Sequence, residues 1–156
     1  MFDANGNLPP GLHDWTHAEC HKNLVVAFAN STTTRKTIWV GYEEFCQVLK
    51  DVGVPCEQLL DGSYVTNKVD PNDLDIITIA NKDDIDGLPS NVLDVLKFYF
   101  MREKTKNICH CHSFLFVTVP EDHHHYELLV KARNKMQDFF SLDRSGNAKG
   151  LVRRIL

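Results

Sequence analysis

The sequence contains no long hydrophobic run and no excess of positive charge. Its apolar stretch at 95–101, VLKFYFM, is interrupted by Lys97 and followed by Arg102, whereas a membrane-spanning helix needs about 20 consecutive apolar residues. The formal net charge is −4 and the isoelectric point is near 6.0. A protein whose whole surface binds nucleic acid is basic, because it must neutralise phosphates. These absences predict a soluble protein without a membrane partner, and they do not indicate nucleic acid as its main partner.

Signals for export are also absent. The first residues, MFDANGNLPPG, are polar and rich in turn formers, so they do not resemble an apolar signal segment. The chain has five cysteines, and an odd number does not suit a full set of disulfides. Because thiols stay reduced in the cytoplasm, we expect a cytoplasmic protein.

No internal repeat, low-complexity tract or long Gly/Ser linker divides the chain. Its 156 residues, 43% of them hydrophobic and 24% charged, suit one compact domain that buries most of its apolar surface. We therefore predict a single domain over residues 1–156. Within it, the Gly- and Pro-rich residues 1–14 should form an irregular N-terminal arm, and residues 143–156 a basic C-terminal tail.

The spacing of hydrophobic residues predicts alternating helices and strands. Thr16 and Glu19 form a capping-box pattern, which marks the start of the first helix. Helices are expected at 16–29, 31–53, 90–100 and 129–140, strands at 56–60, 74–80 and 113–119, and a polar loop at 81–89. This order predicts an α/β (α+β) fold, in which a small mixed β-sheet is flanked by helices and preceded by an N-terminal helical extension.

A stretch between the first two predicted strands carries the candidate chemistry. Residues 61–76 read DGSYVTNKVDPNDLDI, a Gly-Ser turn followed by an Asp-Leu-Asp triplet. Side chains at i and i+2 of a strand point to the same face, so Asp73 and Asp75 should stand side by side with Leu74 in the core. Paired carboxylates supply the oxygen ligands that Mg²⁺ takes together with water and phosphates. We therefore predict that Asp73 and Asp75 are catalytic and bind Mg²⁺ or Mn²⁺.

The turn before the Asp pair is a candidate phosphate site. Gly62 permits a close backbone approach, and the turn amides together with the Ser63 hydroxyl can donate to phosphate oxygens. Thr66 and Lys68 are candidates for further phosphate contacts. A phosphate-binding turn beside a metal-binding carboxylate pair suits nucleotidyl transfer from a nucleoside triphosphate, because the metal lowers the pKa of the incoming hydroxyl.

The stretch resembles the signature of the DNA polymerase β-like nucleotidyltransferase superfamily, in which Gly and Gly or Ser precede an Asp-hydrophobic-Asp/Glu triplet. Gly62, Ser63, Asp73, Leu74 and Asp75 match that signature. The segments NGNLPPGLHDWTHAE, LDGSYVT and DFFSLDRSGNAKGLVRRIL are similar to a family of small bacterial and phage nucleotidyltransferase-like proteins. The resemblance implies a nucleotidyltransferase fold, a nucleoside triphosphate substrate with Mg²⁺, and transfer of a nucleoside monophosphate to a hydroxyl of a protein, an RNA or a small molecule.

The resemblance also implies a third carboxylate on a later strand, and the sequence departs from it there. The stretch CHCHSFLFVTV has no acidic residue, and His112 or Ser113 stands at the corresponding place. His112 is therefore a candidate metal ligand or base. Other substitutes lie in predicted loops: Asp83, Asp84, Asp86, Glu121 and Asp122. The departure motivates a second hypothesis, a catalytically inactive relative that binds a nucleotide or a protein partner in a toxin–antitoxin or phage-defence role.

Other interpretations of these segments stay open. The stretch 61–76 could be a surface hairpin in which Asp73 only caps a turn. The clusters CHCH at 109–112 and HHH at 123–125 contain zinc-binding side chains, although their spacing argues against a structural zinc site. The basic tail could contact phosphates or RNA, or be solvated, through Arg144, Lys149, Arg153 and Arg154. Nothing in the sequence indicates an oligomeric state.

Overall fold

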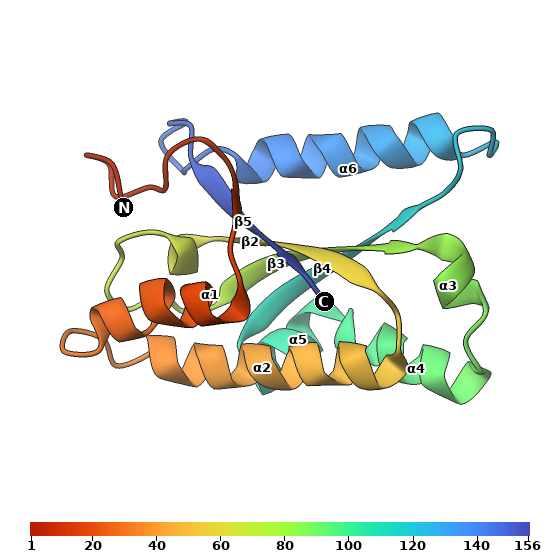
Figure 1. Ribbon diagram of the computed structural model, residues 1–156, viewed down its shortest axis with the longest axis horizontal. Helices are drawn as coiled ribbons and strands as arrows, with labels where there is room; N and C mark the ends of the chain where they lie inside the picture. The colour runs from red at the N-terminus through yellow and green to blue at the C-terminus, as the bar shows by residue number, and fades with distance from the viewer.

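In the computed structural model, five strands form one mixed sheet with helices on both of its faces (Figure 1). The structure describes residues 1–156, with every side chain except that of Arg102. The strands are β1 (Gly11–Asp14), β2 (Cys56–Asp61), β3 (Leu74–Asn81), β4 (Cys111–Thr118) and β5 (Gly150–Ile155). The predicted fold class, a mixed sheet flanked by helices, is confirmed.

The sheet has the order β1-β5-β2-β3-β4. β2 is antiparallel to both β3 and β5, whereas β3 and β4 are parallel, as are β1 and β5. The register places Asp61 of β2 opposite Asp75 of β3, and Asp75 beside His112 of β4. Three polar side chains from three neighbouring strands therefore share one face at one end of the sheet.

The helices divide between the two faces of the sheet. α1 (His17–Leu24), α2 (Arg35–Val52), α4 (Ser90–Tyr99) and α5 (Arg102–Cys109) lie on one face, and α6 (Tyr126–Phe140) lies on the other (Figure 1). Short helical segments complete the chain: η1 (Val26–Phe28), η2 (Ser63–Val65) and α3 (Lys82–Asp86). Within the described residues, no helix has the length and apolar character needed to cross a membrane.

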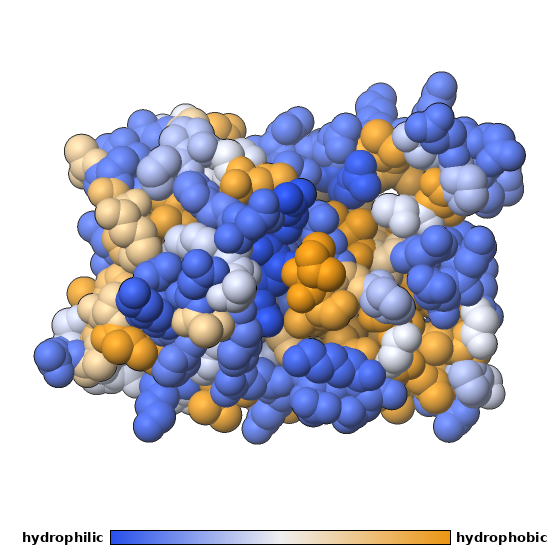
Figure 2. Space-filling view, in the orientation of Figure 1, coloured by the Kyte–Doolittle hydropathy of each residue, from blue (hydrophilic) through white to orange (hydrophobic). Residues whose placement is uncertain are grey.

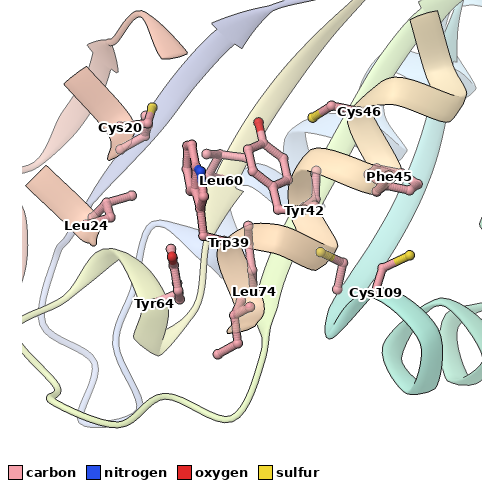
Figure 3. Close-up of a cluster of buried hydrophobic side chains, with 14 of the residues drawn as sticks. Cys20, Leu24, Trp39, Tyr42, Phe45, Cys46, Leu60, Tyr64, Leu74 and Cys109 are labelled. Carbon is pink, nitrogen blue, oxygen red and sulfur yellow. The ribbon is translucent and has the colours of Figure 1, made fainter. Parts of the chain in front are cut away.

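The side of the sheet that faces α2, here called the α2 face, carries the larger hydrophobic core. α2 presents Trp39, Tyr42 and Phe45 toward the sheet because these residues recur at helical spacing. Figure 3 shows Trp39 and Tyr42 close to Leu60 of β2, all three of them buried. Leu74 is 0% exposed in the same cluster, as the alternation of β3 predicts.

The side that faces α6, here called the α6 face, carries a smaller core. Leu59, Ile77 and Leu151 project from the three central strands and pack with Phe140 at the end of α6. Farther along this side, hydrophobic residues reach the surface over the strands between α6 and α2, near the C-terminus (Figure 2). Ile155 of β5 is 73% exposed. One helix therefore covers only part of this face.

Each end of the chain contains a strand that was not predicted. Residues 11–14 of the expected arm form β1, and residues 150–155 of the expected tail form β5, which lies between β1 and β2. The sequence left open whether the basic residues of the tail contact phosphates or RNA or are solvated, and in the fold both arginines of β5 bond to side chains of the same chain. Arg153 forms a bidentate ion pair with Asp14, at 2.5 and 2.8 Å, and buried Arg154 donates to the Tyr42 hydroxyl.

Two further segments differ from the prediction. The polar loop at 81–89 contains α3, whose N-terminus is capped by Asn81. Residues 102–109 form α5, so the CHCH cluster does not lie wholly at a strand entry. Cys109 ends this helix, His110 takes a left-handed conformation with φ of 54°, and Cys111 begins β4. The sharp turn at His110 reverses the chain from helix to strand.

Candidate functional site

A cleft of about 800 Å³ opens on the α6 face, where β2 ends and β3 and β4 begin. Its walls come from the loop after β2, from the strand ends, and from the segment that links α6 to β5. The volume lies within the range of small-molecule sites. The seven residues predicted as the nucleotide and metal site all line this cleft: Gly62, Ser63, Thr66, Lys68, Asp73, Asp75 and His112.

Asp73 and Asp75 lie at the start of β3. Leu74 between them is fully buried on the α2 face, so the two carboxylates point into the cleft, as predicted. Asp73 precedes the first strand residue and pairs with Lys106 of α5, at 2.8 Å between Oδ2 and Nζ. Lys106 was not identified from the sequence, because α5 was not predicted.

Asp75 lies between two other polar side chains. Oδ1 of Asp75 is 3.3 Å from Nδ1 of His112 on β4. Burial raises the pKa of Asp75, the charge of Asp73 raises it further, and His112 opposes the shift. The position predicted for His112, beside the Asp pair, is confirmed.

A further acidic residue, Asp61 at the end of β2, lines the cleft beside Asp75 and was not among the predicted site residues. Asp61 and Asp75 are directly opposite in the antiparallel register, and such pairs have Cβ atoms roughly 4.5 to 5.5 Å apart. The Asp61 side chain is only 3% exposed and forms an ion pair with Lys149, at 2.8 Å. Burial nevertheless raises the pKa of Asp61 to about 6, because desolvation outweighs the attraction of Lys149.

The loop carboxylates considered as substitutes for a third acid lie elsewhere. Among the described residues that line the cleft, none of these five acids is present: Asp83, Asp84, Asp86, Glu121 and Asp122. They follow the carboxyl ends of β3 and β4, whereas the cleft lies at the opposite ends of these strands. A strand of this length separates its ends by about 25 Å. The prediction that one of these loop acids replaces the third carboxylate was therefore wrong, because they lie at the opposite ends of the strands.

Gly62 forms the turn between β2 and η2. Its φ of 78° is in the left-handed region that favours glycine. A Cβ atom at this position would lie 2.3 Å from Oδ2 of Asp75, so the glycine leaves room for the carboxylate against the backbone. The turn and the Asp pair are therefore one structural unit, which accounts for the spacing of the motif.

Two other predicted phosphate contacts, Thr66 and Lys68, differ in whether the side chain is already used within the loop. The Thr66 hydroxyl donates to the carbonyl of Ser63 at 2.8 Å, so it serves the internal structure of the loop. Lys68 is exposed and lines the cleft. Lys68 is thus available to an anion in the cleft, whereas Thr66 would have to give up its hydrogen bond.

Arg35, at the start of α2, holds the loop that carries these residues. Its side chain is 0% exposed, and its guanidinium stacks on Phe28 at 3.7 Å. All three guanidinium nitrogens donate to backbone carbonyls, namely those of Leu24, Tyr64, Thr66 and Lys68, at 2.6 to 3.2 Å. This role was not predicted, because a charged side chain at a helix start is usually solvated.

The opposite wall of the cleft comes from the end of α6 and the loop before β5. Its residues are Phe139, Phe140, Leu142, Asp143, Arg144 and Lys149. These belong to the segment that was predicted as helix end and tail. Of the basic residues considered for phosphate or RNA contacts, Arg144 and Lys149 line the cleft, whereas Arg153 and Arg154 are not among its lining residues. The return of the chain as β5 brings this segment to the Asp pair.

The structure does not bring the two zinc-like clusters together. Cys109 and Cys111 are buried against α2, whereas the three histidines at 123–125 follow the far end of β4 and have their rings in contact with one another. Within the described residues, no three His, Cys, Asp or Glu side chains are grouped to hold a metal ion by themselves. Asp73 and Asp75 suit a Mg²⁺ ion that completes its coordination with water and phosphate. Metal ligation by His112 stays a prediction.

Comparisons with other proteins identify the family and no closer relative. No curated protein and no solved structure matches the chain. The model of a family of unknown function, DUF6932, matches residues 1–154. This match covers four strands completely, all of β5 except Ile155, and both walls of the cleft. The chain therefore belongs to the DUF6932 family.

Proposed function

We propose that the protein is a metal-dependent nucleotidyltransferase, which transfers a nucleoside monophosphate from a nucleoside triphosphate to a hydroxyl of a protein, an RNA or a small molecule. One observation carries this proposal. The Gly62-Ser63 turn and the Asp73-Asp75 pair, which sequence resemblance assigns to phosphate and metal, line one cleft of about 800 Å³. Their packing against each other at Gly62 supports a shared ligand.

Asp73 and Asp75 would hold Mg²⁺ or Mn²⁺, and the bound metal would neutralise phosphate charge and activate the attacking hydroxyl. The amides of the Gly62-Ser63 turn and the exposed Lys68 would bind the phosphate oxygens. In the transfer, the acceptor oxygen bonds to the α-phosphorus, and the bond between the α-phosphorus and the bridging oxygen breaks to release pyrophosphate.

The proton of the acceptor hydroxyl needs a base, and we assign that role to His112. Its Nδ1 lies 3.3 Å from a carboxylate oxygen of Asp75, an arrangement that orients the ring. The Nε2 atom would then accept the proton. This assignment gives His112 the position where the superfamily signature implies a carboxylate.

The proposal is tested by label transfer. The purified protein is incubated with each α-labelled nucleoside triphosphate and Mg²⁺ or Mn²⁺ in cell lysate, and labelled protein or RNA is sought. We expect transfer by the native protein and by Asp83→Ala/Asp84→Ala, whose changes lie in α3 outside the cleft. We expect no transfer by Asp73→Ala/Asp75→Ala. Equal labelling by both variants would refute this site.

A second candidate function rests on two lysines that pair with acidic residues of the cleft. Lys106 neutralises Asp73 and Lys149 neutralises Asp61, each at 2.8 Å, and β4 carries no carboxylate beside Asp75. A site whose acids are already paired favours binding without catalysis. On this hypothesis the protein binds a nucleotide or a protein partner, in a toxin–antitoxin or phage-defence role. Pyrophosphate release above background would contradict it.

We place this activity in the cytoplasm. The five cysteines are free, and all five are buried, which suits a reducing compartment. Nucleoside triphosphates are abundant there, so the proposed substrate is available without transport.

A further inference from the structure

The end of α6 presents two neighbouring phenylalanines to different surroundings. Phe140 is 6% exposed and packs in the core of the α6 face with Leu59 and Ile77. Phe139 is 71% exposed and lines the cleft. Single exposed apolar residues are common and need no explanation. The surroundings of Phe139 therefore decide whether its exposure has a function.

Aromatic rings connect Phe139 to the Asp pair. The ring centroids of His112 and Phe114 are 4.9 Å apart, and those of Phe114 and Phe140 are 5.6 Å apart. The Phe139 ring follows at 5.8 Å from that of Phe140. The cleft is thus polar at Asp73 and Asp75 and aromatic toward the exposed Phe139.

The loop beside Phe139 is held in one conformation. Asp143 accepts hydrogen bonds from the amides of Ser145 and Asn147, at 2.8 and 2.9 Å, and from the side chain of Asn7, at 2.9 Å. The Lys149 amide donates to the carbonyl of Ser141 at 2.8 Å. A wall fixed before binding loses little freedom when a ligand packs on it.

We infer that Phe139 is the platform on which the nucleobase stacks. The inference rests on the proposed function and adds the place of the base to it. The phosphates would lie at the Gly62-Ser63 turn, and the base would lie on Phe139 with Leu142 beside it, both of them on the cleft wall. Stacking uses the face of a base and tolerates all four bases. The site therefore takes any nucleoside triphosphate, with a severalfold preference for the larger purines.

The test separates the base from the phosphates. Calorimetry with Mg²⁺ measures the affinity of the native protein and of Phe139→Ala for ATP, CTP and inorganic triphosphate. We expect Phe139→Ala to weaken ATP binding about tenfold, from the usual contribution of base stacking, and to leave the affinity for inorganic triphosphate unchanged. Phe139→Trp should retain ATP binding. The matched control is Leu128→Ala, an apolar residue of the same helix that is 64% exposed outside the cleft.

The possible outcomes distinguish failure of the stacking inference from failure of the proposed nucleotidyltransferase function. Native binding of inorganic triphosphate and ATP, with no loss of ATP affinity in Phe139→Ala, overturns the inference and leaves the proposed function standing. An equal loss for ATP and inorganic triphosphate also overturns it, because the variant would then disturb the phosphate end. Failure of the native protein to bind either ligand overturns the proposed function and the inference together.

Discussion

On the α2 face of the sheet, side chains from α1, α2 and the strands form a continuous apolar core, whereas on the α6 face the apolar cluster gives way to charged groups. Adjacent residues of one strand illustrate the contrast. Leu60 is 0% exposed in the core of the α2 face, and Asp61 lies on the other face in an ion pair with Lys149. The strands thus provide stability on one face and a polar site on the other.

Arg35 is an exception to this division, because it belongs to the α2 face and yet supports the loop of the cleft on the α6 face. It starts α2 but donates to the carbonyls of the loop that lines the cleft. Arg35→Ala leaves several buried carbonyls unpaired, so we expect a loss of about 4 kcal/mol in the free energy of unfolding, measured by urea denaturation. Arg35→Lys should recover little, because one ammonium cannot reach all these carbonyls. The exposed neighbour Lys36, changed to Ala, is the control, and a similar small effect in both positions would contradict this role.

The buried Asp61 on the α6 face should make the free energy of unfolding depend on pH. Burial raises its pKa in the folded protein from 3.8 to about 6, so the folded state binds the proton more tightly than the unfolded state. The stabilisation from this proton is complete below pH 4 and is lost as the pH rises through about 6. The native protein should therefore lose about 2 to 3 kcal/mol relative to Asp61→Asn across this window.

Urea denaturation of both proteins at several pH values between 4 and 7 measures this difference. Any constant cost of Asp61→Asn cancels, because only the change with pH enters. A difference that stays the same from pH 4 to 7 would show that Asp61 is ionised normally.

A side chain at Gly62 would both strain the backbone and displace the Asp75 carboxylate. Gly53, which has a similar φ but open space around it, serves as the comparison. Gly53 ends α2 with φ of 76°, close to the 78° of Gly62, but a Cβ atom added to Gly53 would have no other atom within 4 Å. Gly53→Ala should cost about 1 kcal/mol from the left-handed backbone, at ψ of 23°. Gly62→Ala should cost about 2 to 3 kcal/mol, because its ψ of −167° lies in a region essentially restricted to glycine and because the new Cβ displaces the Asp75 carboxylate.

Mg²⁺-dependent nucleotide binding distinguishes these variants further. Calorimetry should show binding by Gly53→Ala and none by Gly62→Ala. Intact binding by Gly62→Ala would mean that the position of the Asp75 carboxylate against this turn is unimportant.

Substitution of Thr16 should give the smallest loss of stability. This residue caps α1, which lies on the α2 face, away from the cleft. Its hydroxyl accepts from the amide of Glu19, and its amide donates to the Glu19 carboxylate, at 3.2 and 2.8 Å. Thr16→Ala should cost about 1 kcal/mol through loss of the N-cap of α1, as thermal denaturation can measure. Nucleotide affinity should not change. A weakened affinity would show that the two faces are coupled through α1.

The contrast between the two faces also explains which parts of the fold and of the site could be predicted from the sequence. Periodic apolar residues such as Trp39 and Phe45 predicted α2 correctly, because burial on one side imposes the helical spacing. The fixed spacing of Gly62, Asp73 and Asp75 predicted one unit of the cleft, because these residues are close in the chain.

The remaining parts of the site depend on distant contacts. Lys149 reaches Asp61 only because β5 inserts beside β2, and nothing in a basic terminal segment indicates that pairing. Lys106 is brought to Asp73 by a helix whose sequence, REKTKNIC, has little apolar character. Charges that are neutralised within the fold look, in the sequence, like charges in solvent.

The most direct test of the proposed function is whether the cleft of the α6 face binds nucleotide with Mg²⁺. Each nucleoside triphosphate is titrated, with and without Mg²⁺, into the native protein, Asp73→Asn/Asp75→Asn and the α3 control Asp83→Asn/Asp84→Asn. We predict Mg²⁺-dependent binding by the native protein and the control, and at least about tenfold weaker binding by the cleft variant. Equal affinity in all three proteins, or no binding by the native protein, would contradict the proposed function.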